Sequence, residues 1–460
     1  MSKSFTKRAN HVTPARVAAL KSLELYDDNR GYIRDLIAKV IQTSQMSTED
    51  NSFAMVLSIG VIGYRGTLDE LINSVLKHSN DIKNNIRRAL QISVYELYFL
   101  NKDSHAAVDQ GVELVRYINP RAAGVANFVL RRLSEKREEF PFGDPSADDR
   151  ALARFHGFPQ WLAKCFIEDL GRDAASKLMK QSNCVSQLYF MVNTLRTYGP
   201  QVIEALVSRG YSIAPVPFSK DTLHFFPTFV AIDRNLVGDS LFASLLKEDA
   251  LVVSDWAAQE VVRRSLPSAC PSSMIEIGSG RGTKTVMFQV AAQNRYGKPI
   301  KLSCLDVSAS RLRELKNRVS RARVCVESVI QENAAHSKTL EDSSYDVVFI
   351  DAPCSGTGTL DKHPEIKWNV SSQEVSTLVG VQKSILVSAS KAVSSGGRLV
   401  YATCSALKQE NECVVEDFLQ SEDGKAFSIL PIGDNGEDFF YSLDSEFLCD
   451  VHFCAVLSKN

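Results

Sequence analysis

The sequence of 460 residues lacks several features that mark specialised classes of protein. No stretch approaches eighteen uninterrupted apolar residues, so we expect no contact with a membrane. The ten cysteines include no C-x-x-C pair and the eight histidines show no metal-ligand spacing, which argues against a zinc site and a disulfide framework. The basic start, residues 1–12, has no apolar stretch typical of a signal peptide. We therefore expect a metal-free protein of the reducing cytoplasm.

The net charge is only −1, so no strong excess of one sign points to a partner. A local basic face can still be hidden in a neutral average. With 44% hydrophobic residues the chain can fill large cores, and its length predicts two or three domains. The composition therefore indicates a multidomain globular protein and leaves a nucleic-acid partner open.

Residues 1–138 are predicted to form an all-helical domain. Thr13-Pro14 supplies a helix cap followed by a proline in the first turn, and apolar residues recur at helical spacing in residues 89–100, 106–118 and 123–133. Basic pairs such as Arg87–Arg88 fit a solvated helix face or contact with RNA. Periodicity alone does not choose between these two roles.

The region that follows is less regular. Residues 134–150 are charged and broken by two prolines and a glycine, which is typical of a linker. Residues 150–240 mix helical and strand patterns, and we expect a small α+β module without chemistry of its own.

From residue 241 to 460 strand and helix patterns alternate, which predicts a doubly wound α/β domain with a parallel sheet. A final pair of strands, 438–443 and 448–457, would add an antiparallel hairpin at its edge. The expected parallel strands are 274–277, 300–306, 323–329, 345–350 and 397–404.

Residues at the carboxyl ends of these strands are the candidate binding residues, because open α/β sheets bind ligands there. The first strand runs into Gly278-Ser279-Gly280-Arg281-Gly282, a turn through which a backbone can approach a ligand closely. Asp306 ends the second strand, where a carboxylate can accept hydrogen bonds from a ribose. A plain tight turn and a helix cap are the alternatives. Thr283 stands where the dinucleotide fingerprint needs its third glycine, so the pattern favours S-adenosylmethionine over NAD.

Two cysteines follow neighbouring strands of this sheet. Asp351-Ala352-Pro353-Cys354 ends the fourth strand and Thr403-Cys404-Ser405 ends the fifth. Either cysteine alone could be a small buried hydrophobe. Two of them beside an acid suit methylation of pyrimidine carbon 5, because a thiolate that adds at carbon 6 makes carbon 5 nucleophilic. N-methylation needs no thiol, and the aromatic D/N-P-P-Y-type strand end that is typical of it is absent.

Several motifs match known families. The carboxyl-terminal half resembles the RNA cytosine-C5 methyltransferases of the NOL1/NOP2/Sun family. Residues 87–133, with YEL, HAAVDQGVEL and ANFVLRRL, resemble the NusB-type RNA-binding helical domain. Within the Sun family, the helical domain and HPEIKW indicate the RsmB-type 16S rRNA methyltransferases. The matching stretches of the carboxyl-terminal half are SDWAAQ (254–259), DVSASRL (306–312), DAPCSGTG (351–358), HPEIKW (363–368) and YATCS followed by ENE (401–405 and 410–412).

The resemblance implies roles for individual residues. Cys404 would be the nucleophile, Cys354 would assist release of the methylated RNA, and Asp351 would hold the cytosine edge with Lys284 nearby. The cofactor S-adenosylmethionine would be bound by Gly278, Ser279, Gly280, Arg281, Gly282, Thr283, Lys284, Asp306, Glu332 and Asp351. The substrate would be an unstacked cytosine of 16S ribosomal RNA, and we expect a monomer.

The sequence departs from the family at two places. The family's loop Ala-Ala-Pro-Gly-Gly-Lys-Thr is replaced by Ser279-Gly280-Arg281-Gly282-Thr283-Lys284-Thr285, and Glu332 stands where the family has an aspartate. Two alternatives therefore stay open. One is a non-catalytic NusB-like RNA-binding or antitermination factor with a decayed methyltransferase half, and the other is a tRNA cytosine-C5 methyltransferase. HPEIKW also has two interpretations, since Trp368 can simply pack while His363 and Lys367 can contact RNA.

Overall fold

The computed structural model describes residues 12–29, 31–78, 82–197, 199–216, 225, 227–342, 344–445 and 447–460. The basic residues 1–11 lie outside this set. The chain divides into two compact units: residues 1–184 with 360–371, and residues 185–359 with 372–460. The sequence predicted one module at residues 150–240, but residues 150–184 fall in the first unit and residues 185–240 in the second. The domain limits at 138, 150 and 240 stay predictions.

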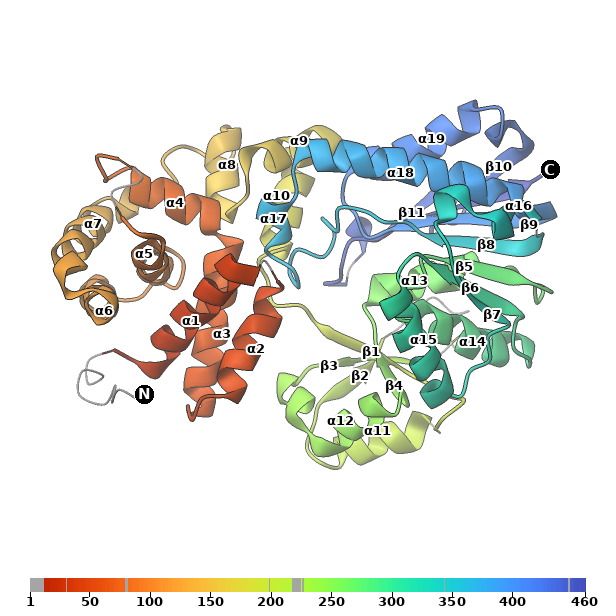
Figure 1. Ribbon diagram of the computed structural model, residues 1–460, viewed down its shortest axis with the longest axis horizontal. Coiled ribbons are helices and arrows are strands. Elements are labelled where there is room, and N and C mark those ends of the chain that lie inside the picture. Colours follow the sequence, from red (N-terminus) through yellow and green to blue (C-terminus); the bar gives the residue numbers. More distant parts are fainter. Residues whose placement is uncertain are drawn as a thin grey trace. The chain divides into compact units, whose positions relative to one another are not determined.

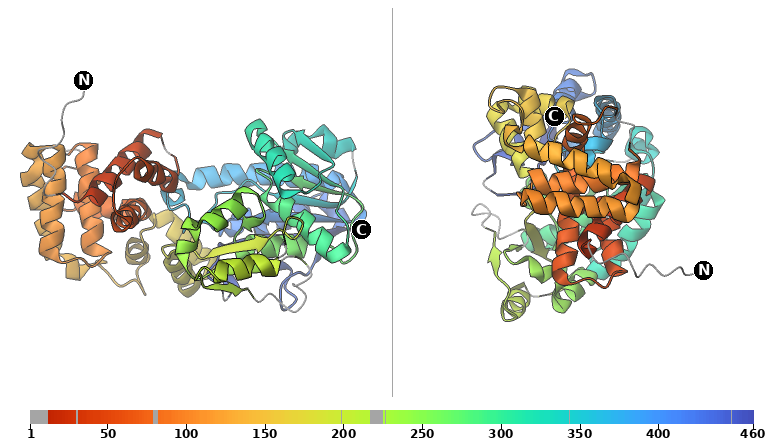
Figure 2. Two further views of the ribbon diagram at one scale, coloured as in Figure 1. Left: turned by 90° about the horizontal axis from the view of Figure 1, so that it is seen from below. Right: turned by 90° about the vertical axis from the view of Figure 1, so that its left-hand side faces the viewer.

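The first unit is helical, as the sequence predicts. Its central helix α5 (Asn84–Tyr98) is buried on nearly every side, and helices α5, α6 and α7 lie side by side in Figure 2. Asp103 caps α6 by accepting a hydrogen bond from the Ala106 N–H. The other helices of the unit are α1 (Pro14–Asn29), α2 (Ile33–Gln42), α3 (Thr48–Gly63), α4 (Arg65–Asn73), α6 (Ser104–Ile118), α7 (Ala123–Glu135), α8 (Asp149–His156), α9 (Gln160–Leu170), α10 (Arg172–Gln181) and the short α17 (Ile366–Asn369).

The second unit begins with a small four-stranded sheet in the order β2-β3-β1-β4, in which all pairs are antiparallel. The sheet reaches residue 253, so its last strand follows rather than precedes the sequence limit at 240. Its elements are β1 (Leu188–Val192), α11 (Gly199–Val207), β2 (Ile213–Pro215), β3 (Thr228–Ala231), α12 (Ser240–Lys247) and β4 (Leu251–Val253).

A larger mixed sheet follows, in the order β10-β12-β9-β8-β5-β6-β7, with β11 paired to β12. Strands β9, β8, β5, β6 and β7 are parallel, and β12 and β10 add antiparallel pairs. The strands are β5 (Met274–Ile277), β6 (Leu302–Asp306), β7 (Ser328–Gln331), β8 (Tyr345–Asp351), β9 (Val393–Thr403), β10 (Phe427–Leu430), β11 (Phe439–Tyr441) and β12 (Phe453–Lys459).

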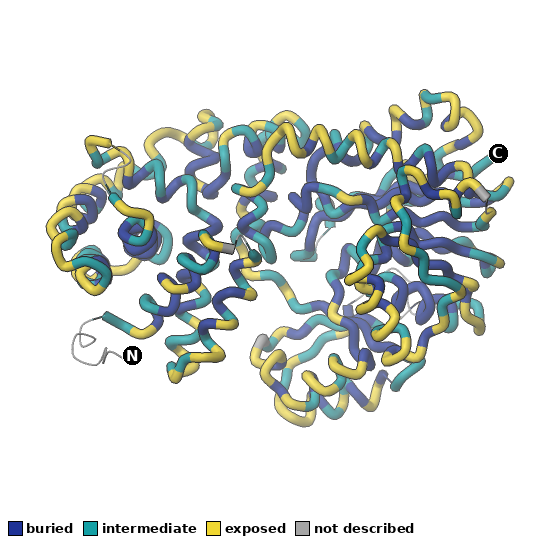
Figure 3. The backbone as a smooth tube through the Cα atoms, viewed as in Figure 1, coloured by how far each residue is buried: buried dark blue, intermediate teal, exposed yellow. Residues whose placement is uncertain are grey.

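Helices cover both faces of this sheet, and its strands are among the most buried segments in Figure 3. On one face α16, α18 and α19 pack on residues such as Ile275 and Ile350, and α18 runs along the sheet in Figure 1. On the other face α13, α14 and α15 pack on residues such as Phe349. The helices are α13 (Trp256–Ser265), α14 (Thr283–Tyr296), α15 (Ala309–Ala322), α16 (Lys338–Asp342), α18 (Ser372–Lys391) and α19 (Glu412–Gln420).

The predicted doubly wound α/β fold is therefore confirmed, with two corrections at its edges. The expected terminal hairpin forms as β11 and β12, but β12 lies between β9 and β10 and is not an edge strand. The strand expected at 323–329 starts only at Ser328, because its pairing with β6 begins at Ser303 and Ser328, whereas Arg323 ends α15 in a left-handed conformation. Within the described residues, no helix is long and apolar enough to cross a membrane.

Candidate active site

The candidate site lies where the chain leaves β5, β6, β8 and β9 at their carboxyl ends. Strand β5 stands between β6 and β8, so the strand order reverses there and opens a crevice for a ligand. The loop after β5 requires glycine at its first position: Gly278 has φ of 78°, and a Cβ atom there would lie 2.3 Å from the carbonyl oxygen of Asp351. The loop thus lies directly against the end of β8.

Asp306 connects the glycine loop to the start of α15. Its two carboxylate oxygens accept hydrogen bonds from the N–H groups of Gly280 and Ser308, at 2.9 and 2.7 Å. The N-cap of α15 is Ser308, so the helix-cap interpretation of Asp306 is wrong. Instead this carboxylate holds the middle of the glycine loop.

Lys284 and Asp351 form a close ion pair at the mouth of the crevice. The ammonium donates to Oδ2 of Asp351 at 2.7 Å, and the two side chains are 13% and 33% exposed. Burial alone would lower the pKa of Lys284, but the charge and hydrogen bond of Asp351 outweigh it and raise the pKa. Lys284 is therefore a fixed positive charge beside the crevice.

The two predicted cysteines meet in the second unit. Their sulfur atoms lie 3.4 Å apart, although fifty residues separate them in the sequence. A hydrogen bond from the Cys354 thiol lowers the pKa of Cys404, and nearby Lys284 lowers it further. The same hydrogen bond, together with burial, raises the pKa of Cys354 well above that of an ordinary thiol. The arrangement therefore favours a thiolate at Cys404 and a protonated thiol at Cys354.

A buried carboxylate joins the two cysteine loops. Glu410 is fully buried and accepts hydrogen bonds from Ser355 N–H at 2.8 Å, from Ser355 Oγ at 2.5 Å and from Ser405 Oγ at 2.5 Å. Gln382 of α18 donates to the same carboxylate at 3.1 Å and to the carbonyl oxygen of Pro353 at 2.9 Å. Each serine directly follows one of the cysteines, so Glu410 holds both sulfur-bearing turns in one position.

Asn411 and Gly358 complete this support. The Asn411 side chain accepts from Thr403 Oγ1 at 2.5 Å and donates to the carbonyl oxygen of Ser405 at 2.9 Å. A Cβ atom on Gly358 would lie 2.8 Å from the Cys404 carbonyl oxygen and 2.1 Å from that of Val451. The ENE segment, which the sequence marked without a role, thus supports the cysteine loops.

The remaining predicted residues occupy different surroundings. Ser279 is buried, whereas Arg281 points outward, is 71% exposed and pairs with Glu314. Glu332 follows β7, one strand beyond Asp306, and its carboxylate accepts from Ser337 Oγ and from Thr339 Oγ1 at 2.5 and 2.9 Å. These bonds lower the pKa of Glu332 and tie its carboxylate to the turn before α16.

A buried acid beneath the glycine loop was not expected from the sequence. Glu276, in the middle of β5, is 1% exposed, and its carboxyl group accepts a hydrogen bond from Thr285 Oγ1 at 2.5 Å. Burial raises the pKa of Glu276 to about 8, so the group is largely protonated at neutral pH. Among the described residues no cluster of three or more histidine, cysteine or acidic side chains is arranged to hold a metal.

The HPEIKW segment belongs to the first unit and is anchored there. Lys367 is 1% exposed, donates to Asn183 Oδ1 at 2.8 Å and lies 4.0 Å from the centre of the Phe158 ring. Trp368 donates through Nε1 to the Ile62 carbonyl oxygen at 2.6 Å. Contact of Lys367 with RNA is therefore wrong for this structure, because the ammonium is enclosed by the first unit, whereas packing by Trp368 is confirmed.

Comparison with known proteins places both halves of the sequence. Residues 272–442 match the family model described as 16S rRNA methyltransferase RsmB/F, and residues 13–135 match that of the NusB family. The probable ribosomal RNA small subunit methyltransferase B of Bacillus subtilis is 24% identical over 411 residues, covering 89% of this chain and 88% of that protein. The ribosomal RNA small subunit methyltransferase B of Xanthomonas campestris is 28% identical over 411 residues, covering 88% and 87%.

Solved structures show the same fold. The crystal structure of PH0851 has a TM-score of 0.74 at 21% identity and covers 97% of this chain and 99% of that one. The structure of NSun6 from Pyrococcus horikoshii with SFG has a TM-score of 0.53 at 18% identity, covering 66% of this chain and 99% of that one. The latter therefore corresponds to only part of the present chain.

Proposed function

We propose that the chain methylates carbon 5 of a cytosine in 16S ribosomal RNA. The premise is that residues 272–442 match the model of the RsmB/F 16S rRNA methyltransferases and residues 13–135 match that of the NusB family. The observation that supports the cytosine-C5 reaction is the pair of sulfurs 3.4 Å apart, of which Cys404 has the lowered pKa. Methyl transfer to a nitrogen would need neither of them.

The residues of the second unit fit S-adenosylmethionine as methyl donor. Gly278 has a positive φ, and a Cβ atom there would lie 2.3 Å from the Asp351 carbonyl oxygen, so this position of the loop has no room for a side chain. We propose that residues 278–284 and Asp306 hold this cofactor, with Asp351 and Glu332 at the rim. When bound, S-adenosylmethionine supplies an electrophilic methyl group on sulfur.

The protein side chains then act on the base. The Cys404 thiolate forms a bond to carbon 6 of the cytosine, which makes carbon 5 nucleophilic toward the methyl group. Asp351, held by Lys284 at 2.7 Å, contacts the cytosine edge and stabilises charge that develops on the ring. Once carbon 5 carries the methyl group, the donor would be left as a neutral thioether. A base then removes the proton from carbon 5, the electron pair restores the double bond between carbons 5 and 6 and expels the Cys404 thiolate, and Cys354 assists this release.

The target base has to leave its stack before Cys404 can reach carbon 6. We propose that the helical region that matches the NusB family contributes to rRNA contact. We also propose that the protein acts as a monomer in the cytoplasm. Its three domains would comprise residues 1–138, 150–240 and 241–460.

One observation favours a second function. The loop Ser279–Thr285 departs from that of the family, so an RNA-binding factor without activity is the alternative. A methyltransferase that acts on transfer RNA is disfavoured, because the similar proteins of Bacillus subtilis and Xanthomonas campestris are named as methyltransferases of small-subunit ribosomal RNA.

The test is transfer of labelled methyl groups from S-adenosylmethionine to unmodified 16S rRNA, with transfer RNA as a second substrate and nucleoside mass analysis. Wild-type protein should form 5-methylcytidine, and Cys404→Ala should form none. Cys354→Ala should accumulate a covalent complex with RNA, because release fails after the bond from Cys404 has formed. RNA binding without methyl transfer by the wild type would favour the inactive factor.

A further inference from the structure

The glycine loop has a support that comes from outside the crevice. Thr283, the first residue of α14, follows Gly282, whose φ is 80° and which supplies no side-chain cap to the helix. The guanidinium of Arg318 donates from Nη1 to Thr283 Oγ1 at 2.6 Å. Arg318 lies on α15, and so does Leu315, one turn earlier. A Cβ atom on Gly282 would lie 3.1 Å from the Leu315 side chain. Helix α15 therefore touches the loop through both apolar and polar side chains.

Arg318 is itself held by an acid from the segment before β4. Asp249 is 5% exposed; its Oδ1 accepts from Nε of Arg318 at 2.9 Å, and its Oδ2 accepts from Arg321 at 2.9 Å. An arginine fixed at Nε and Nη1 has little rotational freedom left, so the position of Asp249 sets the direction of its bond to Thr283.

The backbone around Asp249 is equally well defined. Asp249 has φ of 52°, a left-handed conformation that is uncommon outside glycine and in which asparagine and aspartate are enriched. Its carbonyl oxygen accepts from Asn193 Nδ2 at 2.9 Å, and the same amide donates to the carbonyl oxygen of Ala322 at 2.9 Å. Asn193 follows β1, so the small sheet and the end of α15 are joined at this point.

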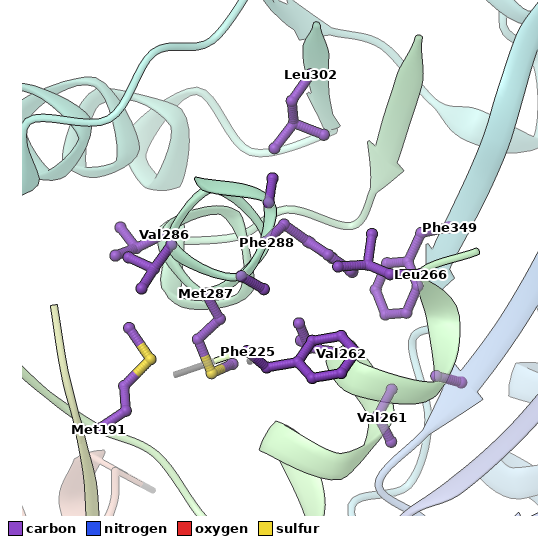
Figure 4. Packing of buried hydrophobic residues seen from close by; sticks show 14 of the residues in the cluster. Met191, Phe225, Val261, Val262, Leu266, Val286, Met287, Phe288, Leu302 and Phe349 are labelled. Atoms are coloured by element: carbon purple, nitrogen blue, oxygen red, sulfur yellow. The ribbon is translucent and has the colours of Figure 1, made fainter. Parts of the chain in front are cut away.

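The small sheet packs through apolar side chains against helix α14, which begins at the glycine loop. Met191 of β1 and Val252 of β4 belong to the same buried cluster as Val286 and Met287 of α14. Figure 4 shows Met191 and Met287 in this cluster. The module expected to have no chemistry of its own is thus packed against the helix that begins in the cofactor loop.

We propose that Asp249 is a positioning residue for S-adenosylmethionine: through Arg318 it fixes the hydroxyl of Thr283 and so the glycine loop that holds the cofactor. This inference rests on the proposed function. Thr283 replaces the second of the paired glycines in the family's loop. Its hydroxyl accepts a hydrogen bond from Arg318, which a glycine at this position could not do.

The test compares affinity for S-adenosylmethionine, measured by calorimetry on the full chain, between matched variants. Asp249→Asn, Arg318→Met and Thr283→Val should each weaken binding by about 5- to 30-fold, because each removes a link of the same contact. Arg321→Met is the control and should stay within about twofold, since Arg321 contacts Asp249 but has no bond to Thr283. Combining Arg318→Met with Thr283→Val should add little to either loss.

Two further readouts separate positioning from general stability. Affinity for 16S rRNA should not change, and the affinity losses should not follow the melting temperatures of the variants. Thr283→Val removes one hydroxyl from a half-buried position, so it tests the contact even where Asp249→Asn fails to fold.

The outcomes are distinct. If the wild type binds S-adenosylmethionine and Thr283→Val and Arg318→Met bind it equally tightly, the inference is overturned and the proposed function stands. Absence of binding by the wild type would overturn both.

Discussion

Replacement of Glu410 by glutamine is the sharpest perturbation of the cysteine pair. The carboxylate accepts four hydrogen bonds, from Ser355 N–H, Ser355 Oγ, Ser405 Oγ and Gln382 Nε2. Hydrogen bonds to a charged acceptor are stronger than neutral ones by about 1 kcal/mol each. Partial compensation by the amide leaves an expected loss of roughly 1–3 kcal/mol in the free energy of unfolding.

The amide has one preferred orientation. Its oxygen must face Ser355 N–H and Gln382, which can only donate, and its NH₂ group must face the two serine hydroxyls, which can rotate to accept. The two turns that carry Cys354 and Cys404 would therefore stay near each other but would no longer be held by a charged acceptor. A displacement of about 1 Å can lower a rate by roughly 100-fold, so we expect kcat for methyl transfer to fall by about 10- to 100-fold.

Thiol chemistry provides a readout of opposite sign. The hydrogen bond between the cysteines raises the pKa of Cys354 and lowers that of Cys404, whereas the negative charge of Glu410 is a smaller influence that raises the pKa of both. Its removal should lower the pKa of Cys404, so alkylation by iodoacetamide at pH 7 should become faster while methyl transfer becomes slower. A residue that served stability alone would not separate these two rates.

The matched control is Glu416→Gln, an exposed position on α19 that follows the same ENE segment. It should leave methyl transfer, alkylation and the melting temperature as in the wild type. Wild-type kcat in a folded Glu410→Gln variant would refute the role assigned to this carboxylate.

Three other substitutions test separate parts of the structure. Burial raises the pKa of Glu276 from 4.5 to about 8, so the contribution of this group to the free energy of unfolding is full below pH 4.5 and is lost as the pH rises through 8. In denaturant titrations, Glu276→Gln should reduce this pH-dependent loss of stability by roughly 2–4 kcal/mol at pH 9. Gly358→Ala would place a Cβ atom 2.1 Å from the Val451 carbonyl oxygen, so we expect about 2–4 kcal/mol lower stability in urea unfolding and loss of methyl transfer. Trp368→Phe removes the bond to the Ile62 carbonyl oxygen and should lower the stability of the first unit by about 1–2 kcal/mol, measured by hydrogen exchange of α3.

Much of the α/β fold was predictable because local patterns and the fold agree there. Strand β5 has the predicted limits, and β6 and β8 start or end within two residues of them. Strands β6 and β8 end in Asp306 and Asp351 at their carboxyl ends, and β5 ends in Ile277 directly before the glycine loop. By contrast β10 (Phe427–Leu430) was missed, because it becomes a strand through pairing with β12, which no local pattern shows.

The candidate site was predictable to the level of the strand ends. The order of strands brings the turns after β8 and β9 together, so the proximity of Cys354 and Cys404 followed from the topology alone. The division of charge between them did not, because it depends on a 3.4 Å contact and on Lys284. Such electrostatic effects arise only from three-dimensional distances.

The supporting residues were beyond sequence reasoning for a related physical reason. Asp249 is an ordinary acid in the sequence, and Glu410 stood out only as part of the ENE stretch, to which the sequence assigned no role. Each is buried because it accepts hydrogen bonds from segments far away in the chain: Ser355 is 55 residues from Glu410, and Arg318 is 69 residues from Asp249. A buried carboxylate is stable only where such donors surround it, so its burial cannot be predicted without knowing its hydrogen-bond partners.

Glu332 shows the limit of assigning a residue by position alone. Counting back from Asp351 placed it as the acid on the adenine side of the cofactor, and it does follow β7 beside Asp306. Its carboxylate, however, already accepts hydrogen bonds from Ser337 and Thr339, so any bond to a cofactor would use the lone pairs that remain. The longer glutamate reaches this turn through its extra methylene. If Glu332 serves the cofactor, it does so as a carboxylate held in place by α16, in the same way that Gly280 and Ser308 hold Asp306.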